Sequence, residues 1–458
     1  MTVGTVAPLR EITLHDTLTG KILPLRTREP GKVAIYACGP TVYGRVHVGN
    51  ARPFAVFSLL KRFLQHEGYE VTFVANVTDV NDKIYAAAAA ANLDSETLAF
   101  EMTAHYLADT DALGLGRPDH EPRASTTMPE IVALIALLIE RGHAYAVGGD
   151  VYFSVRSHPS YGELSHRRLE DMDQGEGGEG AGRKREPFDF ALWKAHKPGE
   201  DTAWDAPWGR GRPGWHIECS AMAEALLGVD FEIHGGGSDL IFPHHENEAA
   251  QTSAAHGEPL ARLWVHNGMV RVQREKMAKS VGNTFLLHAA LAAYGRDALI
   301  TYFCGGHYRQ PIDFDDARLA AASASVERFR EAADRLVPGP SPSWSAALRD
   351  QFFAALAEDF NTPRALAAAF EWVREANRSD EPAGDADLRE MLGVLGLANL
   401  LDVADVAVSA QAQALLDRRQ AARARRNWGE ADSLRDELRS LGWEIRDSPD
   451  GPKLRPLQ

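Results

Sequence analysis

The chain has 458 residues, of which 45% are hydrophobic and 25% are charged, and its formal net charge is −15. This length predicts two to four domains, and the composition excludes a disordered or fibrous protein. The longest uninterrupted apolar run, Ile131–Ile139, is too short to span a membrane, so we expect no membrane partner. Three cysteines exclude a disulfide framework, and the N-terminus lacks a signal-peptide pattern, so we expect a cytoplasmic protein.

The negative net charge, taken alone, argues against a nucleic-acid partner. Binding depends on local patches, however, and the segment 418–458 holds ten Lys and Arg against seven Asp and Glu, which makes it locally +3. This excess permits a polyanionic partner at the C-terminal end without requiring one.

The N-terminal part of the chain predicts a parallel sheet. The apolar run Val33–Ala37 is typical of a buried strand, and a helical repeat over 54–64 and a second strand at Tyr69–Val74 follow it. Such a βαβ unit binds ligands at the carboxyl ends of its strands, where Cys38 and the loop around His47 fall. The turn lacks Gly-x-Gly-x-x-Gly, which excludes an NAD-binding domain. The short His-x-Gly-x match is, by itself, more typical of an incidental helix cap than of a nucleotide site.

The middle of the chain is predicted to be an insertion. We expect helices over 83–115 and 131–140 and a strand at Val151–Val155. Pro and Gly residues indicate that the chain leaves the sheet from about 116 to 204. The glycine-rich, charged segment 171–186 is typical of an exposed loop, and we assign it no chemistry.

A cluster of zinc-binding side-chain types follows the insertion. Phe231–His234 predicts a strand, Gly235–Gly237 predicts its turn, and the next helix carries His244 and Glu248 four residues apart on one face. Cys219 lies shortly before this stretch. Thiolate, imidazole and carboxylate are the three side-chain types that bind zinc.

The expected fourth zinc ligand is Cys38, far back in the chain. The sequence contains no local zinc knuckle. The residues alone are therefore about equally compatible with a structural zinc that stabilises the fold and with a zinc that binds a substrate. Cys304 is left over, and we interpret it as a small buried hydrophobic residue.

The last third of the chain is predicted to be mostly helical. Lys276 and Lys279 lie in a loop and can reach phosphates, although an isolated pair of this kind is more typical of a solvated basic turn. The proline-rich segment 337–343 predicts a domain boundary. Apolar residues from Trp428 to Leu441 recur every three or four residues, which predicts an amphipathic helix, and a β-hairpin is expected after it.

Six short motifs follow one another along the chain. The motifs are Cys38-Gly-Pro-Thr-Val-Tyr43, His47-Val-Gly-Asn-Ala-Arg52, Gly214-Trp-His-Ile-Glu-Cys-Ser-Ala221, His234-Gly-Gly-Gly-Ser-Asp-Leu240, Pro243-His-His-Glu-Asn-Glu-Ala-Ala-Gln251 and Lys276-Met-Ala-Lys-Ser280. This is the order found in cysteinyl-tRNA synthetases, and the chain resembles that family from about residue 10 to its end. The resemblance also includes Asp359–Arg364 and Asn427–Asp432.

The resemblance implies a class I aminoacyl-tRNA synthetase and a role for each matching residue. The implied zinc ligands are Cys38, Cys219, His244 and Glu248. The implied catalytic residues are His47, Lys276 and Lys279, which also bind ATP together with Gly49 and Asn50. The implied substrate-binding residues are Gly39, Thr41, Trp215 and His234.

The chain departs from the family pattern at two positions. Asn50 replaces the final His of the His-Ile-Gly-His signature, a variant that the family tolerates. Ala278 replaces the middle Ser of the Lys-Met-Ser-Lys-Ser loop and removes one hydroxyl, while both lysines remain.

The implied fold is an α/β Rossmann-like parallel-sheet catalytic domain with an insertion, followed by a helical domain and a small anticodon-binding domain. The expected segments are the first half of the catalytic domain at 1–115, the connective insertion at 116–204, the second half with the zinc site and the lysine loop at 205–285, a stem-contact helical region at 286–336, a helical bundle at 337–405 and the anticodon-binding domain at 406–458.

The resemblance implies that the protein activates L-cysteine with ATP and Mg²⁺ and charges tRNA(Cys), with one Zn²⁺ per chain, as a monomer. Zinc would separate cysteine from serine, because a thiolate is a soft ligand that zinc prefers to a hydroxyl. We therefore expect no editing domain. The basic cluster from Arg418 to Arg426, just ahead of Trp428, would contact the tRNA.

Two other functions fit part of this pattern. The ligase of mycothiol biosynthesis, which joins cysteine to a glucosaminyl inositol, shares the zinc site and the adenylate chemistry but lacks a full anticodon-binding tail, and residues 406–458 resemble such a tail. A catalytically inactive zinc protein that only binds RNA is the second alternative, and the retention of Lys276 and Lys279 argues against it.

Overall fold

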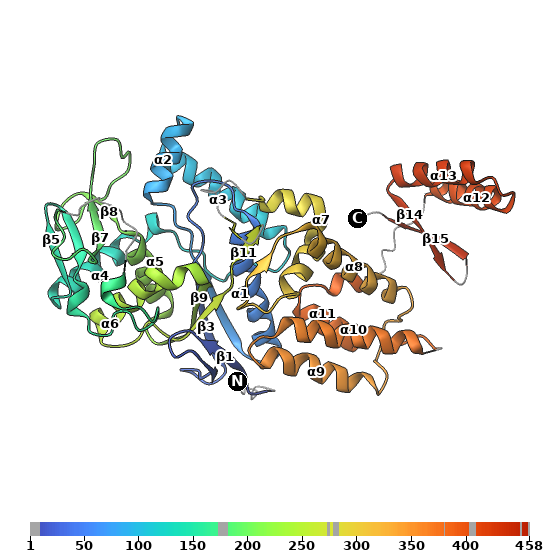
Figure 1. Ribbon diagram of the computed structural model, residues 1–458, viewed down its shortest axis with the longest axis horizontal. Helices are drawn as coiled ribbons and strands as arrows, with labels where there is room; N and C mark the ends of the chain where they lie inside the picture. The colour runs from blue at the N-terminus through green and yellow to red at the C-terminus, as the bar shows by residue number, and fades with distance from the viewer. Residues whose placement is uncertain are drawn as a thin grey trace, which may run out of the picture. The chain divides into compact units, whose positions relative to one another are not determined.

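The chain forms two compact units, Met1–Asn399 and Leu400–Gln458 (Figure 1). The computed structural model describes residues 10–172, 182–272, 275–277, 284–379, 381–402, 409–448 and 451–456.

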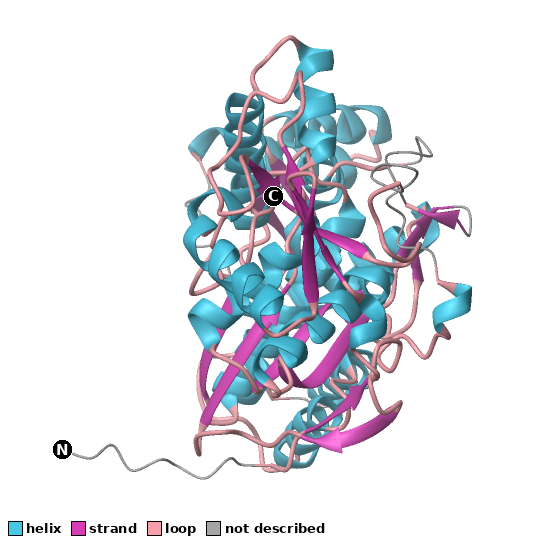
Figure 2. Ribbon diagram, turned by 90° about the vertical axis from the view of Figure 1, so that its left-hand side faces the viewer, coloured by secondary structure: helices cyan, strands magenta, loops and turns pink. Residues whose placement is uncertain are grey.

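A four-stranded parallel sheet forms the centre of the larger unit. Its order is β10–β9–β3–β4. The strands are β3 at Lys32–Ala37, β4 at Glu70–Ala75, β9 at Phe231–Gly237 and β10 at Ala261–Asn267. Their side chains are buried almost throughout, because helices surround a parallel sheet of this kind (Figure 2). All four carboxyl ends therefore meet at one edge, as the βαβ pattern predicted.

Helix α1, Val48–His66, connects β3 to β4. It begins at His47 with a reciprocal capping box: the His47 ring Nδ1 accepts the N–H of Asn50, and the Asn50 side-chain oxygen accepts the N–H of His47, each at 3.3 Å. Because α1 starts directly after the carboxyl end of β3, its N-terminus lies at the ligand-binding edge of the sheet.

The predicted insertion forms an antiparallel sheet of its own. The strands are β5 at Ala144–Val147, β6 at Asp150–Phe153, β7 at Phe190–Ala195 and β8 at Gly211–Pro213. Helix α4, Met128–Glu140, buries Ile131 and Ile135 in the same core as Phe153 and Phe190. Since β8 follows residue 204, this sheet continues past the predicted end of the insertion.

The predicted helical stretch 83–115 consists of two helices, α2 at Asp82–Ala91 and α3 at Ser95–Asp111. Asn92 adopts a left-handed conformation with φ 56° and ends α2, and the Asp94 carboxylate then caps the first turn of α3. The sequence prediction missed this break because helix-forming residues precede and follow Asn92 and Asp94.

The glycines at 235–237 belong to strand β9, so their prediction as a turn was wrong. A Cβ at Gly235 would lie 2.2 Å from the Phe57 ring and 2.3 Å from the Val265 carbonyl oxygen. The strand continues through these glycines because its neighbours pack directly against the backbone.

The remaining elements of the larger unit follow the predicted order. They are β1 at Thr13–Asp16, β2 at Lys21–Pro24, α5 at Trp215–Leu227, α6 at Glu246–His256, β11 at Val270–Val272, β12 at Glu275–Lys276, α7 at Leu287–Cys304, β13 at Ile312–Asp313, α8 at Asp316–Ala333, α9 at Ser345–Ala357, α10 at Thr362–Arg378 and α11 at Ala386–Val394. No helix among the described residues is both long and apolar enough to cross a membrane.

The proline-rich segment 337–343 packs within the larger unit. The Val337 N–H donates to the Ala383 carbonyl at 3.0 Å, and the Asp385 N–H donates to the Val337 carbonyl at 3.1 Å. The division between the two units falls between Asn399 and Leu400, near the predicted start of the C-terminal domain.

The described part of the C-terminal unit contains the predicted amphipathic helix and β-hairpin, together with a further helix that precedes them. These elements are α12 at Ala410–Ala424, α13 at Trp428–Ser440, β14 at Trp443–Ser448 and β15 at Gly451–Pro456. Leu415, Leu434, Leu438 and Trp443 form its core. Trp428, predicted to lie on the apolar face of α13, is instead 58% exposed, because it stands at the first position of the helix and outside the packed stripe.

Candidate active site

A cleft of about 640 Å³ opens at the carboxyl edge of the parallel sheet. Residues that follow or end all four central strands line it: Cys38 after β3, Ala75 of β4, Gly237 of β9 and Asn267 of β10. The cleft is also lined by the predicted site residues Gly39, Thr41, His47, Gly49, Asn50, Trp215 and Lys276. The structure therefore gathers residues from distant parts of the sequence at one edge.

The four predicted metal ligands converge behind the cleft wall. One ligand atom from each of Cys38, Cys219, His244 and Glu248 lies within 4.8 Å of the other three, and all four side chains are buried. Glu248 Oε1 is 3.4 Å from Cys38 Sγ and 2.9 Å from His244 Nε2. Cys38 follows β3, Cys219 lies in α5, His244 precedes α6 and Glu248 lies within it.

A second group of potential ligands shares two of these residues. His234 and His245 join Cys38 and Glu248 in a set that is equally compact. His234 Nε2 lies 3.8 Å from Cys38 Sγ and 3.2 Å from Glu248 Oε2. Among the described residues, His245 Nε2 is buried without a hydrogen-bond partner, as expected for a nitrogen whose lone pair faces a cation.

Burial and mutual contact strongly shift the pKa values in this cluster. A hydrogen bond with Cys38 lowers the pKa of the Cys219 thiol to about 7, although burial opposes the shift. Burial and the neighbouring Cys219 hold the pKa of Cys38 well above its usual value. Burial would lower the pKa of His244, but the charges of Glu248 and Cys219 outweigh it and raise that pKa to about 10. These opposing shifts indicate a site in which anionic sulfur and oxygen need a positive partner.

Surrounding aromatic residues orient the ligand side chains. His216 and His244 share a hydrogen bond between their Nδ1 atoms at 2.9 Å, which leaves His244 Nε2 directed at Glu248. The Trp215 ring stacks on His244 with centroids 4.3 Å apart. Trp215 therefore touches both the cleft and a ligand, as a substrate-side residue would.

Buried contacts also hold His234 and His245, the two histidines of the second ligand group. His245 Nδ1 contacts His266 Nε2 at 2.7 Å, and His266 Nδ1 contacts the Thr17 hydroxyl at 2.7 Å. The Tyr36 ring stacks on His234 with centroids 5.2 Å apart. Sequence reasoning assigned no role to His216, His245 or His266; the adjacent pairs Trp215-His216 and His244-His245 are the signal that could have indicated the first two.

Gly39 is required by close backbone packing at the sheet edge. Its N–H donates to the Asn76 side chain at 2.9 Å, and a Cβ at this position would lie 1.7 Å from the Asn76 carbonyl oxygen. Gly39 therefore lets the loops after β3 and β4 meet at the floor of the cleft.

The N-terminus of α1 gives the cleft a place suited to phosphate. His47, Gly49 and Asn50 line the cleft there, and the N–H groups and dipole of the helix favour an anion. Because His47 Nδ1 accepts the Asn50 N–H, the neutral ring carries its proton on Nε2 and can donate it to a ligand. A Cβ at Gly49 would lie 2.9 Å from the His47 ring, so glycine leaves room for that ring.

The lysine loop is described only in part. Lys276 lies in β12 and its Nζ is 2.9 Å from Asp239 Oδ2 at the cleft. Lys279 and Ala278 lie outside the described residues. Lys83 also lines the cleft, with its Nζ 5.6 Å from the centre of the Tyr43 ring.

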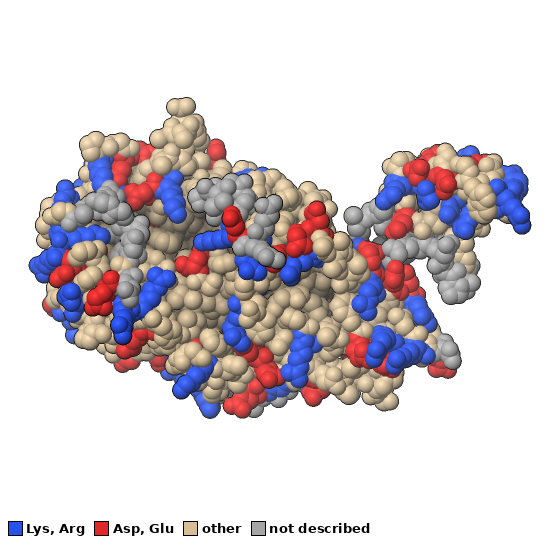
Figure 3. Space-filling view, in the orientation of Figure 1, with Lys and Arg blue, Asp and Glu red and all other residues tan. Residues whose placement is uncertain are grey.

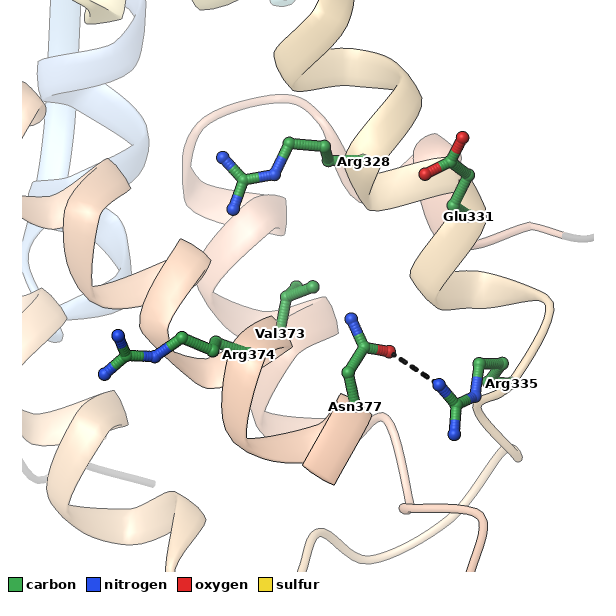
Figure 4. Close-up of a pocket in the computed structure, with 6 residues that line it drawn as sticks. All are labelled: Arg328, Glu331, Arg335, Val373, Arg374 and Asn377. Carbon is green, nitrogen blue, oxygen red and sulfur yellow. Dashed lines mark hydrogen bonds between the residues drawn. The ribbon is translucent and has the colours of Figure 1, made fainter. Parts of the chain in front are cut away.

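A separate pocket of about 460 Å³ lies between α8 and α10, away from the sheet edge (Figure 4). Its lining residues are Arg328, Glu331, Arg335, Val373, Arg374 and Asn377. Arg335 donates to Asn377 at 3.4 Å, and the Arg328 guanidinium lies over the Phe370 ring at 4.4 Å. Since these side chains engage neighbouring residues and include no metal-ligand cluster, we assign this pocket no catalytic role.

Solved structures place the fold in a known class. The chain is similar to the Mycobacterium tuberculosis methionyl-tRNA synthetase in complex with methionyl-adenylate, with a TM-score of 0.58 at 16% identity over 81% of this chain and 90% of that one. It is also similar to a putative arginyl-tRNA synthetase from Campylobacter jejuni, with a TM-score of 0.51 at 12% identity over 82% and 92%. Residues 24–324 match the model of the class I (C) tRNA synthetase catalytic domain. The sheet, the cleft and this match define a class I aminoacyl-tRNA synthetase.

Sequence relatives narrow the class to one family. Residues 351–401 match the DALR domain, and 405–455 match the cysteinyl-tRNA ligase anticodon binding domain. The chain is 44% identical to the Cysteine--tRNA ligase of Pseudothermotoga lettingae over 95% of this chain and 97% of the relative. It is 46% identical to that of Halorhodospira halophila over 96% and 99%. The chain belongs to the cysteine–tRNA ligase family, which confirms the resemblance seen in the motifs.

Proposed function

We propose that this protein is the enzyme that activates L-cysteine with ATP and transfers the cysteinyl group to the 3′ end of tRNA(Cys). The observation that carries the proposal is the joint geometry of the cleft. Cys38 lines the cleft and belongs to a buried cluster of two thiols, an imidazole and a carboxylate, and His47 and Asn50 line the same cleft at the N-terminus of α1. A substrate with a thiol and a partner with phosphates fit these two groups of residues.

The buried cluster fits zinc better than other common cations. Cys38, Cys219, His244 and Glu248 offer two sulfurs, a nitrogen and an oxygen, and calcium and magnesium prefer oxygen alone. The set with His234 and His245 contains one sulfur fewer, so we assign those histidines to support the ligands and the substrate side chain. When bound, zinc would lower the pKa of a substrate thiol and prefer the resulting thiolate to a serine hydroxyl.

Zinc selection explains why no editing step is needed. A purely apolar pocket separates close analogues by only ~1–3 kcal/mol. Trp215 and Thr41 line the cleft together with Cys38, and Gly39 lets the loop after β3 pack closely against Asn76. The described part of the insertion packs into a core that it shares with α5 and α6, and we assign it no editing chemistry.

Adenylate formation requires alignment more than covalent catalysis. The carboxylate of cysteine attacks the α-phosphate of ATP, and pyrophosphate leaves. His47 Nε2–H, Lys276 and Lys279 would stabilise the charge on the phosphates, with Mg²⁺ arriving with ATP. Gly49 and Asn50 would shape the nucleotide site, because they hold the His47 ring and the first turn of α1.

Lys279→Ala should slow adenylation far more than it weakens cysteine binding. The reason is that the lysine would act on the leaving group and not on the amino acid. Single-turnover rates with cysteine binding measured in parallel test this, and equal losses in both would contradict the leaving-group role.

The C-terminal unit would bind the tRNA. Arg418, Arg423, Arg425 and Arg426 are exposed, and basic side chains gather at one end of this unit (Figure 3). Trp428 follows them and is 58% exposed, so its ring could stack on an unpaired base. The presence of this unit favours tRNA over a glucosaminyl inositol as the acceptor of the cysteinyl group. We expect the enzyme to act as a monomer.

Cysteine-dependent exchange of pyrophosphate into ATP tests the proposed reaction. Exchange should require cysteine, fail with serine and fall when a chelator removes zinc. Deletion of residues 406–458 should abolish tRNA charging and spare exchange. Equal exchange with serine and cysteine would refute zinc selection, and charging by the truncated protein would refute the role of the C-terminal unit.

A further inference from the structure

Arg52 is a fully buried cation in the first turns of α1, close to the capping box formed by His47 and Asn50. Among the described residues, its hydrogen-bond partners are main-chain carbonyls and no carboxylate. Its Nη1 donates to the Gly268 oxygen at 2.5 Å and to the Met269 oxygen at 3.4 Å, and its Nη2 donates to the His307 oxygen at 3.3 Å.

Burying a guanidinium in this way is costly. Removing an ion from water carries a large penalty, and neutral carbonyls compensate it less well than a carboxylate does. Burial lowers the pKa of Arg52 to about 10, so the group stays protonated at neutral pH. The planar guanidinium can, however, donate hydrogen bonds to two separate segments of main chain at once.

The segment that Arg52 holds is a wall of the cleft. Gly268 and Met269 connect β10 to β11, and both line the cleft. The Asn267 side chain donates to the same Gly268 oxygen at 3.0 Å. On its other side Gly268 packs against the backbone near Gln310, where an added Cβ would lie 2.3 Å from the Gln310 carbonyl carbon. Hydrogen bonds from Arg52 and Asn267 and close packing against Gln310 therefore fix the position of Gly268.

This wall leads towards the N-terminus of α1, because a Cβ at Gly49 would lie 3.8 Å from the Cβ of Val270, the residue that follows the wall. The strand that it leads into, β11, pairs with β12, with Arg271 opposite Lys276. The Met277 N–H donates to the Val270 carbonyl at 3.0 Å. The metal ligands, in contrast, come from α5, from α6 and its preceding turn, and from the loop after β3.

We propose that Arg52 is a positioning residue for ATP. It ties the Gly268–Met269 wall to α1, so that one rigid helix sets both His47 and the facing wall of the nucleotide site. The proposal rests on the proposed function, because it requires that ATP bind at this end of the cleft. It predicts that loosening the wall weakens ATP binding and leaves cysteine binding nearly unchanged.

The test compares Arg52→Lys and Arg52→Gln with a matched control on the same helix. Arg62 also donates to a main-chain carbonyl, that of Gly393 at 2.6 Å, but it lies at the far end of α1. In cysteine-dependent pyrophosphate exchange, Arg52→Gln should raise the KM for ATP about tenfold, the size expected for one lost charge-assisted hydrogen bond. Arg52→Lys should lie between Arg52→Gln and the wild type. The KM for cysteine should change less than about twofold, and Arg62→Lys should change neither KM.

Direct titration of the full-length, zinc-loaded variants with ATP and with cysteine keeps the test decisive if exchange falls below detection. Weaker ATP binding with unchanged cysteine binding supports the proposal. Equal loss of both affinities, an unchanged KM for ATP, or the same effect in Arg62→Lys overturns it and leaves Arg52 a structural residue. Failure of wild-type exchange with cysteine would instead refute the proposed function, which separates the two outcomes.

Discussion

Replacing Cys219 by serine tests the metal site with little disturbance of the fold. Cys219 is 1% exposed and lies in α5, where its sulfur is within 4.8 Å of the ligand atoms of Cys38, His244 and Glu248. Serine differs only by oxygen for sulfur, so the substitution opens no sizeable cavity. Any large effect must therefore come from the chemistry of the ligand.

The expected loss can be worked from the pKa of the thiol. The hydrogen bond from Cys38 lowers the pKa of Cys219 from an ordinary value of 9.0 to about 7. Burial and the same pairing raise the pKa of Cys38, so the two thiols act as one unit whose deprotonation a bound cation would favour. A serine hydroxyl stays protonated and is a harder, poorer ligand, so zinc affinity should fall by about a hundredfold or more.

Zinc content per chain, measured by elemental analysis after dialysis against a weak chelator, gives the readout. Cys304→Ser is the matched control, because Cys304 is also 1% exposed but stands outside the cluster, in α7. We expect the wild type and Cys304→Ser to retain one zinc and Cys219→Ser to lose it, together with the preference for cysteine over serine in pyrophosphate exchange. Stoichiometric zinc in dialysed Cys219→Ser would refute the ligand set.

Two further predictions concern stability. Burial opposes protonation of His66, but its hydrogen bonds to Glu67 and Glu390, at 3.0 and 2.7 Å, raise its pKa above 6.5. The folded state therefore gains stability from protonated His66. This gain is complete below pH 6.5 and is lost as the pH rises through the higher pKa of the folded state. Urea unfolding should give a lower free energy of unfolding at pH 8 than at pH 6 for the wild type, and a smaller difference for His66→Gln. The same difference in both proteins would contradict the assignment. Gly39→Ala should lower the melting temperature by several degrees, because its Cβ would overlap the Asn76 carbonyl oxygen, and a melting temperature equal to that of the wild type would show that the loop relaxes freely.

The sequence predicted the metal cluster for two different reasons. Helical spacing alone places His244 and Glu248 one turn apart, and the structure brings their side chains to 2.9 Å. Cys38 and Cys219 have no local pattern that connects them, and their meeting depends on the parallel pairing of β3 with β9. The family resemblance implied that both cysteines hold the same ion, and no pattern along the chain predicted the strand pairing itself.

Other features depended on contacts that local patterns do not reveal. The second group, with His234 and His245, exists because His234 of β9 lies 3.2 Å from Glu248 of α6, a contact between distant segments of the chain. Arg52 stands within a quoted motif, yet its burial against the Gly268 carbonyl is visible only in three dimensions. Periodicity placed Trp428 in the core of its helix, whereas its terminal position leaves it exposed.

X-ray absorption at the zinc edge of the full-length enzyme tests the central claim most directly. Without substrate, we predict a zinc shell of two sulfurs with nitrogen or oxygen completing it, as Cys38, Cys219, His244 and Glu248 would give. Addition of cysteine should add a third sulfur, and addition of serine should change nothing. A shell with fewer than two sulfurs, or a sulfur count that cysteine does not alter, would contradict the account.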